Sequence, residues 1–139
     1  MEWGVPQRAF AVERCGKPHY GSMTDTIRLT VPAGLRGAGV VALVLGGLGS
    51  RLDFQVDRID ELALAAATVA PSVDGPDLHL EVDVHDDRLL LRMGPLEDGV
   101  GGDAATRRIV DALVDRVAAV RQDGREWLEL ELVRGRAGR

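Results

Sequence analysis

The chain has 139 residues, of which 45% are hydrophobic and 28% charged, and this is the size and balance of one globular domain. Its 17 basic and 22 acidic residues give a net charge of -5, which excludes the overall positive charge of a general nucleic-acid binder. The single cysteine, Cys15, excludes an internal disulfide and favours a cytoplasmic protein, and the longest apolar runs, Val40–Leu45 and Leu62–Ala67, are too short to cross a membrane.

Residues 1–22 differ from the rest of the chain. They contain the one lysine and three of the five aromatic residues, and they show no sustained hydrophobic period. We therefore expect an N-terminal extension, either poorly ordered or the product of a start assigned upstream of Met23. The sequence predicts one domain over residues 23–139.

The regular pattern begins with a strand and a helix. Ile27, Leu29 and Val31 alternate with polar residues as in a strand with one buried face, and Pro32 stops the strand. Apolar residues at helical spacing then predict a helix over residues 35–52. This helix contains five glycines, each costing about 1 kcal/mol relative to alanine, so packing must hold it and a partner could approach it closely.

A second helix and a hairpin follow. Asp57 is expected to cap a helix with an apolar face that ends at Pro71. Residues 78–84 and 88–93 each alternate between apolar and polar side chains, which predicts two strands joined by a short turn. One face of this hairpin should contact water.

The last part of the chain predicts a loop, a helix and a strand. The loop covers residues 94–103, and the strand covers residues 127–133. The helix is expected to bury an apolar stripe made of Ile109, Ala112, Leu113, Val117 and Val120. Every predicted strand alternates, so the sheet should be covered on one face only, giving a two-layer α/β sandwich with a mixed, mostly antiparallel sheet and three helices on one face.

Two segments of the sequence resemble those of a known protein family. The stretch IRLTVPAGLRGAGVVALVLGGLGSRLDFQVDRIDELALA and the later IVDALVDRV resemble bacterial anti-sigma factors of the serine-kinase type. The resemblance covers Thr26 to Val133 and implies the ATPase fold of histidine kinases, with dimeric members. It also implies a partner surface on the first helix, at Arg36, Gly39 and Ala42, where the family's usual outward arginines are missing at the last two positions.

The nucleotide motifs of that family are altered in this chain. Active members carry a glutamate that acts as a base and, four residues later, an asparagine that binds magnesium; the equivalent positions here are Thr68 and Ser72. Threonine has no carboxylate to accept a proton, and serine is a weak neutral ligand for a hard cation. The chain contains no asparagine that could replace the missing ligand.

A second family motif, DxGxG, places an aspartate against the adenine amino group. The equivalent position at the end of the hairpin is Met93. Glu97, Gly99 and Gly101 offer an ExGxG pattern four residues later, but this offset moves the loop relative to the sheet. The resemblance therefore leaves Glu97 as a candidate adenine contact on a displaced lid.

The third family motif is a glycine pair that cradles phosphate against the N-terminus of the third helix. The equivalent positions are Ala104 and Thr106. Because three motifs are degraded together, we expect the nucleotide site to be lost, with no catalytic residue and no cofactor. ATP and Mg²⁺ are expected only if the chain is an active kinase after all.

These observations leave three hypotheses. The first is an anti-sigma-like regulator that acts by binding a sigma factor or an anti-sigma antagonist, as a homodimer, without contacting nucleic acid or membrane. The second is an active Mg-ATP-dependent serine kinase that phosphorylates the antagonist through Glu97 and a rearranged lid. The third is a scaffold or dimerisation module with neither partner nor nucleotide.

The remaining clusters of polar residues are better explained as ordinary surface than as metal-binding or partner-binding sites. Four metal-ligating residue types share one face of the first hairpin strand, namely His79, Glu81, Asp83 and His85. Same-face neighbours lie ~6.6 to 7 Å apart along a strand, too far for more than two to reach one ion, so a solvated face and no metal are expected. Cys15 and His19 have the spacing of half a zinc site, but the chain has no second pair. Arg107 and Arg108 are expected to be a solvated pair, with binding of an acidic partner segment as the alternative.

Overall fold

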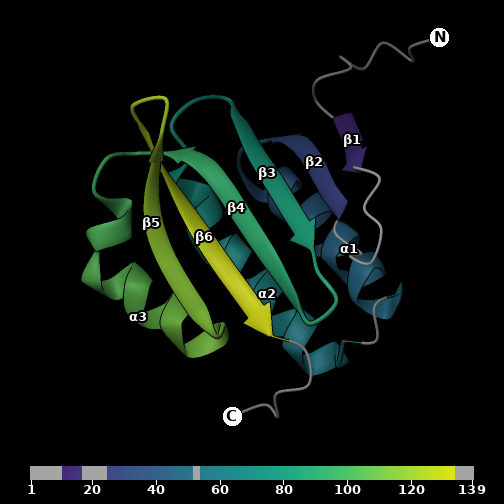
Figure 1. Cartoon of the computed structure of the whole chain (residues 1–139). Coiled ribbons are helices and arrows are strands. Elements are labelled where there is room, and N and C mark those ends of the chain that lie inside the picture. Colours follow the sequence, from purple (N-terminus) through teal and green to yellow (C-terminus); the bar gives the residue numbers. More distant parts are fainter. Residues whose placement is uncertain (1–10, 17–24, 52–53, 134–139) are drawn as a thin grey trace, which may run out of the picture.

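The computed structural model describes residues 11–16, 25–51 and 54–133. In chain order the strands and helices are β1 (Ala11–Gly16), β2 (Asp25–Pro32), α1 (Leu35–Arg51), α2 (Val56–Val69), the 3-10 turn η2 (Ala70–Ser72), β3 (Asp77–Val84), β4 (Arg88–Leu96), the 3-10 turn η3 (Val100–Gly102), α3 (Ala104–Leu113), β5 (Arg116–Gln122) and β6 (Arg125–Val133). Figure 1 shows one twisted sheet with the three α-helices on the same side of it. Within the described ranges, no helix combines the length and apolar character needed to span a bilayer.

The described strands form one sheet in the order β1-β2-β3-β4-β6-β5. Every pair of neighbours in this order is antiparallel, so the sheet is antiparallel throughout the described strands rather than mixed. The two-layer α+β arrangement expected from the alternating strands is confirmed. α2 lies between α1 and α3 in the helical layer (Figure 1).

The core lies between the sheet and the helices. Leu80, Leu91 and Leu130 come from three neighbouring strands and are almost completely buried. Leu62 of α2 and Leu45 of α1 pack into the same cluster from the helical layer. The polar residues that alternate with these leucines face the other side of the sheet, as the period of two predicts.

The prediction for the third helix was wrong over its second half. α3 ends at Leu113, and Val117 and Val120 belong to β5, which forms a hairpin with β6. The chain leaves the helix because Val114 adopts an extended conformation while its N–H still bonds to a helical carbonyl. Ile109, expected to be buried, is 48% exposed, and Ala112 is exposed as well.

The first predicted helix agrees with α1, and smaller differences occur elsewhere. Gln55 occupies the N-cap position of α2 without a side-chain hydrogen bond, so the expected cap by Asp57 is wrong, and Asp57 lies in the first turn. β4 continues beyond Met93 to Leu96, with a shift of register between these two residues. Of the expected extension, residues 11–16 form β1, which pairs with β2, and residues 1–10 and 17–22 lie outside the described part of the chain.

A buried ion pair joins the helical layer to the C-terminal strands. Arg58 in α2 contacts Asp115, which lies between α3 and β5, with 2.9 Å between Nη2 and Oδ2, and only 4% of each side chain is exposed. The same carboxylate oxygen accepts a hydrogen bond from the Val133 N–H at 2.7 Å. Asp115 therefore connects α2 with the end of β6.

The outer face of the sheet carries a close contact between a tryptophan and a glycine. The indole of Trp127 in β6 lies against Gly94 in β4, and a Cβ added to Gly94 would sit 2.7 Å from Cδ2 of the indole. Real Cβ atoms do not approach other atoms so closely, so this packing requires glycine at position 94.

Candidate functional site

Thr68 and Ser72, which the resemblance places at the family's base and magnesium positions, are neutral and form hydrogen bonds within the fold. Thr68 donates its hydroxyl to the carbonyl of Leu64, one turn earlier in α2, at 2.9 Å. Ser72 ends η2, and its carbonyl accepts the Glu97 N–H at 2.9 Å. Neither side chain offers a carboxylate that could accept a proton at neutral pH or an amide oxygen of the kind that binds Mg²⁺ in the family.

The two candidates for the adenine contact lie in different environments. Met93 is completely buried on the inner face of β4, where its thioether is at most a weak hydrogen-bond acceptor. Glu97 comes directly after β4 and is exposed. Met93 therefore lies on the inner face of the strand, whereas Glu97, four residues later, lies on the surface of the following loop.

The glycine-rich loop after β4 is held by a carboxylate from the last strand. Glu126 in β6 is 7% exposed and accepts two backbone hydrogen bonds from the loop, from the Gly99 N–H at 2.7 Å and the Gly101 N–H at 2.5 Å. Gly99 has a φ of 94°, a conformation that side chains rarely adopt. A Cβ at Gly101 would lie 2.5 Å from Ala119 and equally close to Glu126. We refer to Glu126 and these two N–H groups as the glutamate clamp.

An arginine fixes the same loop from the other side. Arg107 in α3 donates from Nη1 to the Gly101 carbonyl at 2.8 Å and from Nη2 to the Val117 carbonyl at 3.5 Å. Its Nε is buried and has no partner among the described residues. The expectation of a solvated pair therefore holds only for Arg108, which is exposed, because Arg107 joins the loop to β5.

The N-terminus of α3 is capped by an acid. The Asp103 carboxylate accepts the Thr106 N–H at 2.9 Å, and this hydrogen bond, followed by one with the Thr106 hydroxyl, lowers the pKa of Asp103 below its usual value. Ala104 and Thr106, at the family's glycine positions, form the first turn behind it. A carboxylate thus occupies a helix end that would otherwise be suited to an anion.

Glu126 and Asp103 give the site its electrostatic character. Each carboxylate accepts backbone N–H groups of the kind that bind phosphate in glycine-rich loops and at helix ends. A phosphate placed at either position would meet a negative charge and find these donors already bonded. Sequence reasoning did not identify Glu126, although it lies two residues before the inward-facing Leu128 and so falls on the inner side of β6.

The expected partner surface is exposed. Arg36, Gly39 and Ala42 follow one another at three-residue intervals on α1 and all face solvent. The next residue, Leu43, was not singled out from the sequence and is 78% exposed. A Cβ at Gly39 would meet nothing within 4 Å, so no internal packing requires glycine there.

The candidate metal ligands on β3 are engaged by neighbouring strands. Glu81 pairs with Arg28 at 3.0 Å and with Arg92 at 3.6 Å. Asp83 accepts a hydrogen bond from the Thr26 hydroxyl at 2.7 Å. His79 shares one with the Thr30 hydroxyl at 3.0 Å. In the described part of the chain, no group of three His, Cys, Asp or Glu side chains could hold a metal ion; Cys15 lies in β1, and His19 is outside this part.

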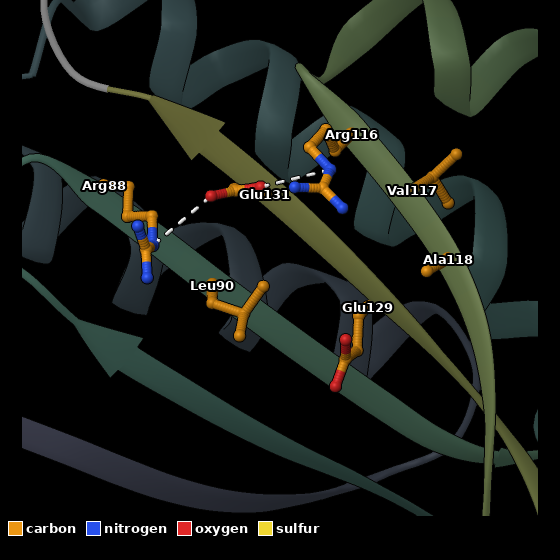
Figure 2. A pocket seen from close by; sticks show the side chains of 7 residues that line it. All are labelled: Arg88, Leu90, Arg116, Val117, Ala118, Glu129 and Glu131. Carbon is orange, nitrogen blue, oxygen red and sulfur yellow. Dashed lines mark ion pairs between the residues drawn. The ribbon is translucent and has the colours of Figure 1, made fainter.

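The outer face of β4, β6 and β5 also contains a shallow hollow of about 270 Å³. It is lined by Arg88, Leu90, Arg116, Val117, Ala118, Glu129 and Glu131. Figure 2 shows Glu131 between the two arginines, 3.3 Å from Arg88 and 3.6 Å from Arg116. Because the charges compensate each other, this hollow lacks the surplus of either sign that would select a charged ligand.

The antiparallel sheet with three helices on one face is consistent with the histidine-kinase-like ATPase fold. No family model matches the chain. Among curated proteins, the chain is similar to the serine-protein kinase RsbW of Halalkalibacterium halodurans, with 31% identity over 71 residues. The match covers 47% of this chain and 44% of the relative, so the chain spans less than half of that protein's length. This partial match supports the resemblance to the anti-sigma serine kinases.

Proposed function

We propose that the protein is a regulator that acts by binding another protein, in the manner of an anti-sigma factor, and that its nucleotide site has been lost. The observation that carries this proposal is the glutamate clamp. Glu126 satisfies the Gly99 and Gly101 donors with a negative charge, so the loop is closed to phosphate in this arrangement. Thr68 and Ser72 support the same conclusion because they supply neither a carboxylate base nor an amide ligand for Mg²⁺.

The proposed partner is a sigma factor or an anti-sigma antagonist. The resemblance to the anti-sigma family and the match to a serine-protein kinase support this choice. The proposed docking surface is the exposed face of α1 around Arg36, Gly39, Ala42 and Leu43. The action would be occlusion, because a partner bound there is kept from its other contacts.

The chemistry of this face suits an apolar partner surface. From Gly37 to Ser50 the helix carries no charged residue. Gly46 and Gly47, like Gly39, would tolerate a Cβ without meeting any atom within 4 Å, and these glycines allow a partner backbone to approach closely. Full burial of a leucine contributes about 1.5–3 kcal/mol, which Leu43 could supply to binding.

An active Mg-ATP-dependent serine kinase is the second candidate function. This function is supported by the sequence match to a serine-protein kinase and by the exposed carboxylate of Glu97 at the start of the loop. This function would require the loop to leave Glu126, together with a base and metal ligand other than Thr68 and Ser72. The third candidate, a scaffold, would bind neither nucleotide nor sigma-related partner.

Calorimetric titration with Mg-ATP and Mg-ADP tests loss of the site. We expect no binding at millimolar nucleotide, because acids hold the backbone donors of the glycine-rich loop and of the α3 N-terminus, and the asparagine is absent. Micromolar binding would contradict the proposal and favour the kinase. Transfer of radiolabelled phosphate from ATP to an anti-sigma antagonist would then establish that activity.

Capture on immobilised full-length protein tests partner binding. Sigma factors and antagonists retained from a lysate of the source organism would be identified by mass spectrometry. Leu43→Glu on α1 should lose them, whereas the matched variant Leu64→Glu, at a position 56% exposed on α2, should retain them. Retention of neither class by the unmodified protein, or equal retention by both variants, would contradict docking on α1.

A further inference from the structure

The chain contains three Asp-Gly pairs, and all of them lie in exposed connections between regular elements. They are Asp74–Gly75, Asp98–Gly99 and Asp123–Gly124. The three glycines have positive φ values of 123°, 94° and 74° respectively. Asp-Gly is the pair in which an aspartate side chain most readily reacts with its own backbone, because glycine has no side chain to hinder the attack of its nitrogen. The environments of the three pairs decide which of them is open to this reaction.

The reaction needs no reagent other than water. The glycine nitrogen attacks Cγ of the protonated aspartate side chain, an N–Cγ bond forms, and a carboxyl oxygen leaves as water with the amide proton. The product is a cyclic succinimide. Water then opens the ring, and where it breaks the bond between the nitrogen and the aspartate backbone carbonyl carbon, the chain continues through the side chain as isoaspartate. The reaction therefore requires an unbonded glycine N–H and a carboxyl group that can turn toward it.

The glutamate clamp blocks this reaction at Asp98–Gly99. The Asp98 side chain is 82% exposed, but the Gly99 N–H is donated to Oε1 of Glu126 at 2.7 Å. Glu126 is buried, and hydrogen bonds to charged groups are roughly twice as strong as neutral ones. The Gly99 nitrogen is therefore available only when the loop leaves Glu126.

At Asp74–Gly75 the carboxyl group is held instead. Oδ2 of Asp74 accepts a hydrogen bond from Nη2 of Arg125 at 2.9 Å, and the Asp74 carbonyl accepts one from the same nitrogen at 3.1 Å. The Asp74 N–H is donated to the Pro95 carbonyl at 2.8 Å. Rotation of this carboxyl group toward the Gly75 nitrogen therefore costs contacts of both the side chain and the backbone.

Asp123–Gly124 lacks both kinds of protection. The pair forms the two-residue turn between Gln122 and Arg125, the last pair of the β5–β6 ladder, and a turn of this kind leaves the nitrogen of its second residue outside the ladder. Among the described residues, neither the Asp123 carboxylate nor the Gly124 N–H has a hydrogen-bond partner. Arg121 donates to the Gly124 carbonyl at 2.7 Å, which leaves the nitrogen free. Asp123 also has a φ of 55°, a conformation that is unfavourable for a residue with a Cβ, so opening of the turn relieves strain.

We propose that Asp123–Gly124 is a modification site at which the aspartate isomerises with time, and that the isoaspartate formed there loosens the glutamate clamp. Isoaspartate places Cβ in the main chain and lengthens it by a bond of ~1.5 Å. A two-residue turn matches the twist of its strands only with its normal backbone. The proposal goes beyond the proposed function, because it concerns a covalent change in this chain and not a partner on α1.

The glutamate clamp lies close to this turn along β6. Glu126 follows Gly124 by two positions and pairs in register with Arg121 of β5. A longer turn therefore shifts the first residues of β6, and with them the carboxylate that accepts the Gly99 and Gly101 N–H groups. These two N–H groups then exchange faster with solvent.

Ageing of the full-length chain at neutral pH and physiological temperature tests the site. Isoaspartate is located in proteolytic peptides by electron-transfer fragmentation and mass spectrometry. We expect it to form at position 123 at least about tenfold faster than at positions 74 and 98. In the chain denatured by guanidinium chloride the three rates should agree, because the fold no longer engages any of the three glycine nitrogens or aspartate side chains.

Two variants separate the site from its effect. Asp123→Gly is the matched control, since Gly-Gly also forms a two-residue turn but offers no carboxyl group. Hydrogen exchange at Gly99 and Gly101 should accelerate as the unmodified chain ages and stay constant in Asp123→Gly. Glu126→Gln weakens the bond to the Gly99 N–H and should raise the rate of isomerisation at Asp98 but not at position 74.

The outcomes distinguish the two halves of the proposal. Equal rates at the three positions of the folded chain, or a faster reaction at position 74 or 98, would overturn the assignment of the site. Absence of isoaspartate at position 123 in the folded chain, while the denatured chain reacts, would overturn it as well. Isoaspartate at position 123 with unchanged exchange at Gly99 and Gly101 would overturn its effect on the glutamate clamp.

Discussion

α2 and α3 lie side by side in one helical layer but are held in different ways. α2 has 14 residues and buries six of them, which are Arg58, Ile59, Leu62, Ala65, Ala66 and Val69. α3 has ten residues and buries Val110. Its position depends on polar contacts, namely the Asp103 cap and the Arg107 bond to the Gly101 carbonyl. The comparison separates a helix held by apolar burial from one held by a few directional bonds.

This difference has consequences for local stability. Burial of apolar area is non-directional and is shared among many atoms, so five apolar residues hold α2 in addition to the buried ion pair of Arg58. A helix with little buried area opens at a lower free energy than the core, and each polar contact can be removed individually. We expect α3 and the glycine-rich loop to open as a unit while the sheet and α2 remain folded.

The largest expected effect comes from the ion pair that links the two regions. Arg58→Met leaves the Asp115 carboxylate buried without its arginine, which costs about 3–5 kcal/mol of the free energy of unfolding. Urea denaturation measures this loss. A loss below about 1 kcal/mol would mean that Asp115 reaches water and that the pair does not join α2 to β6.

The double variant Arg58→Met with Asp115→Asn is the matched control. Asparagine can still accept the Val133 N–H, and no buried charge remains. We expect the double variant to be more stable than Arg58→Met alone. Additive losses would contradict coupling between the two side chains.

An intermediate effect is expected at the glutamate clamp. Glu126→Gln preserves size but removes the charge that accepts the Gly99 and Gly101 N–H groups, and bonds to a charged group contribute about 1.5–3 kcal/mol. Amide hydrogen exchange at these glycines should become roughly ten- to a hundredfold faster. The Leu62 amide in α2 should be unchanged. Equal acceleration at both places would show that loop and core open together.

The smallest expected effect is a pH dependence at the start of α3. Because the folded-state pKa of Asp103 is lowered below 3.8, its stabilising contribution is complete above that value and is lost as the pH falls through the folded pKa. The stability difference between the unmodified chain and Asp103→Ala should therefore be present at pH 7 and disappear in strong acid. Asp103→Ser keeps a capping acceptor that does not titrate, so its contribution at this position should not vary with pH.

The order of elements could be predicted from the sequence up to α3, because apolar spacing of about 3.6 or 2 marks each helix and strand. The exceptions are β1, which lies within the segment expected to be an extension, and β5. Val117 and Val120 continue the helical spacing of Ile109, and the alanines between them carry no polarity to reveal an alternation. The signal that was available is the Asp-Gly pair at 123–124, since a two-residue turn of this kind needs a strand on each side.

The candidate site was predictable in part. Changes such as Met93 and Ser72 can be read from the sequence because a missing carboxylate or amide is visible without coordinates. The glutamate clamp could not be read, because Glu126 lies 27 residues after Gly99 in the chain and meets it only through the hairpin of β5 and β6. The alternation of β6 shows from the sequence that Glu126 faces inward, but it does not show that Glu126 binds the N–H groups of the loop.

The contact between Trp127 and Gly94 sets the order in which these two positions can change. Any side chain at position 94 collides with the indole, whereas a smaller residue at position 127 creates only an open space on the solvent side of the sheet. A change at Trp127 can therefore be accepted first and a change at Gly94 only afterwards. In evolution, substitution of Trp127 before Gly94 is therefore easier than substitution in the reverse order.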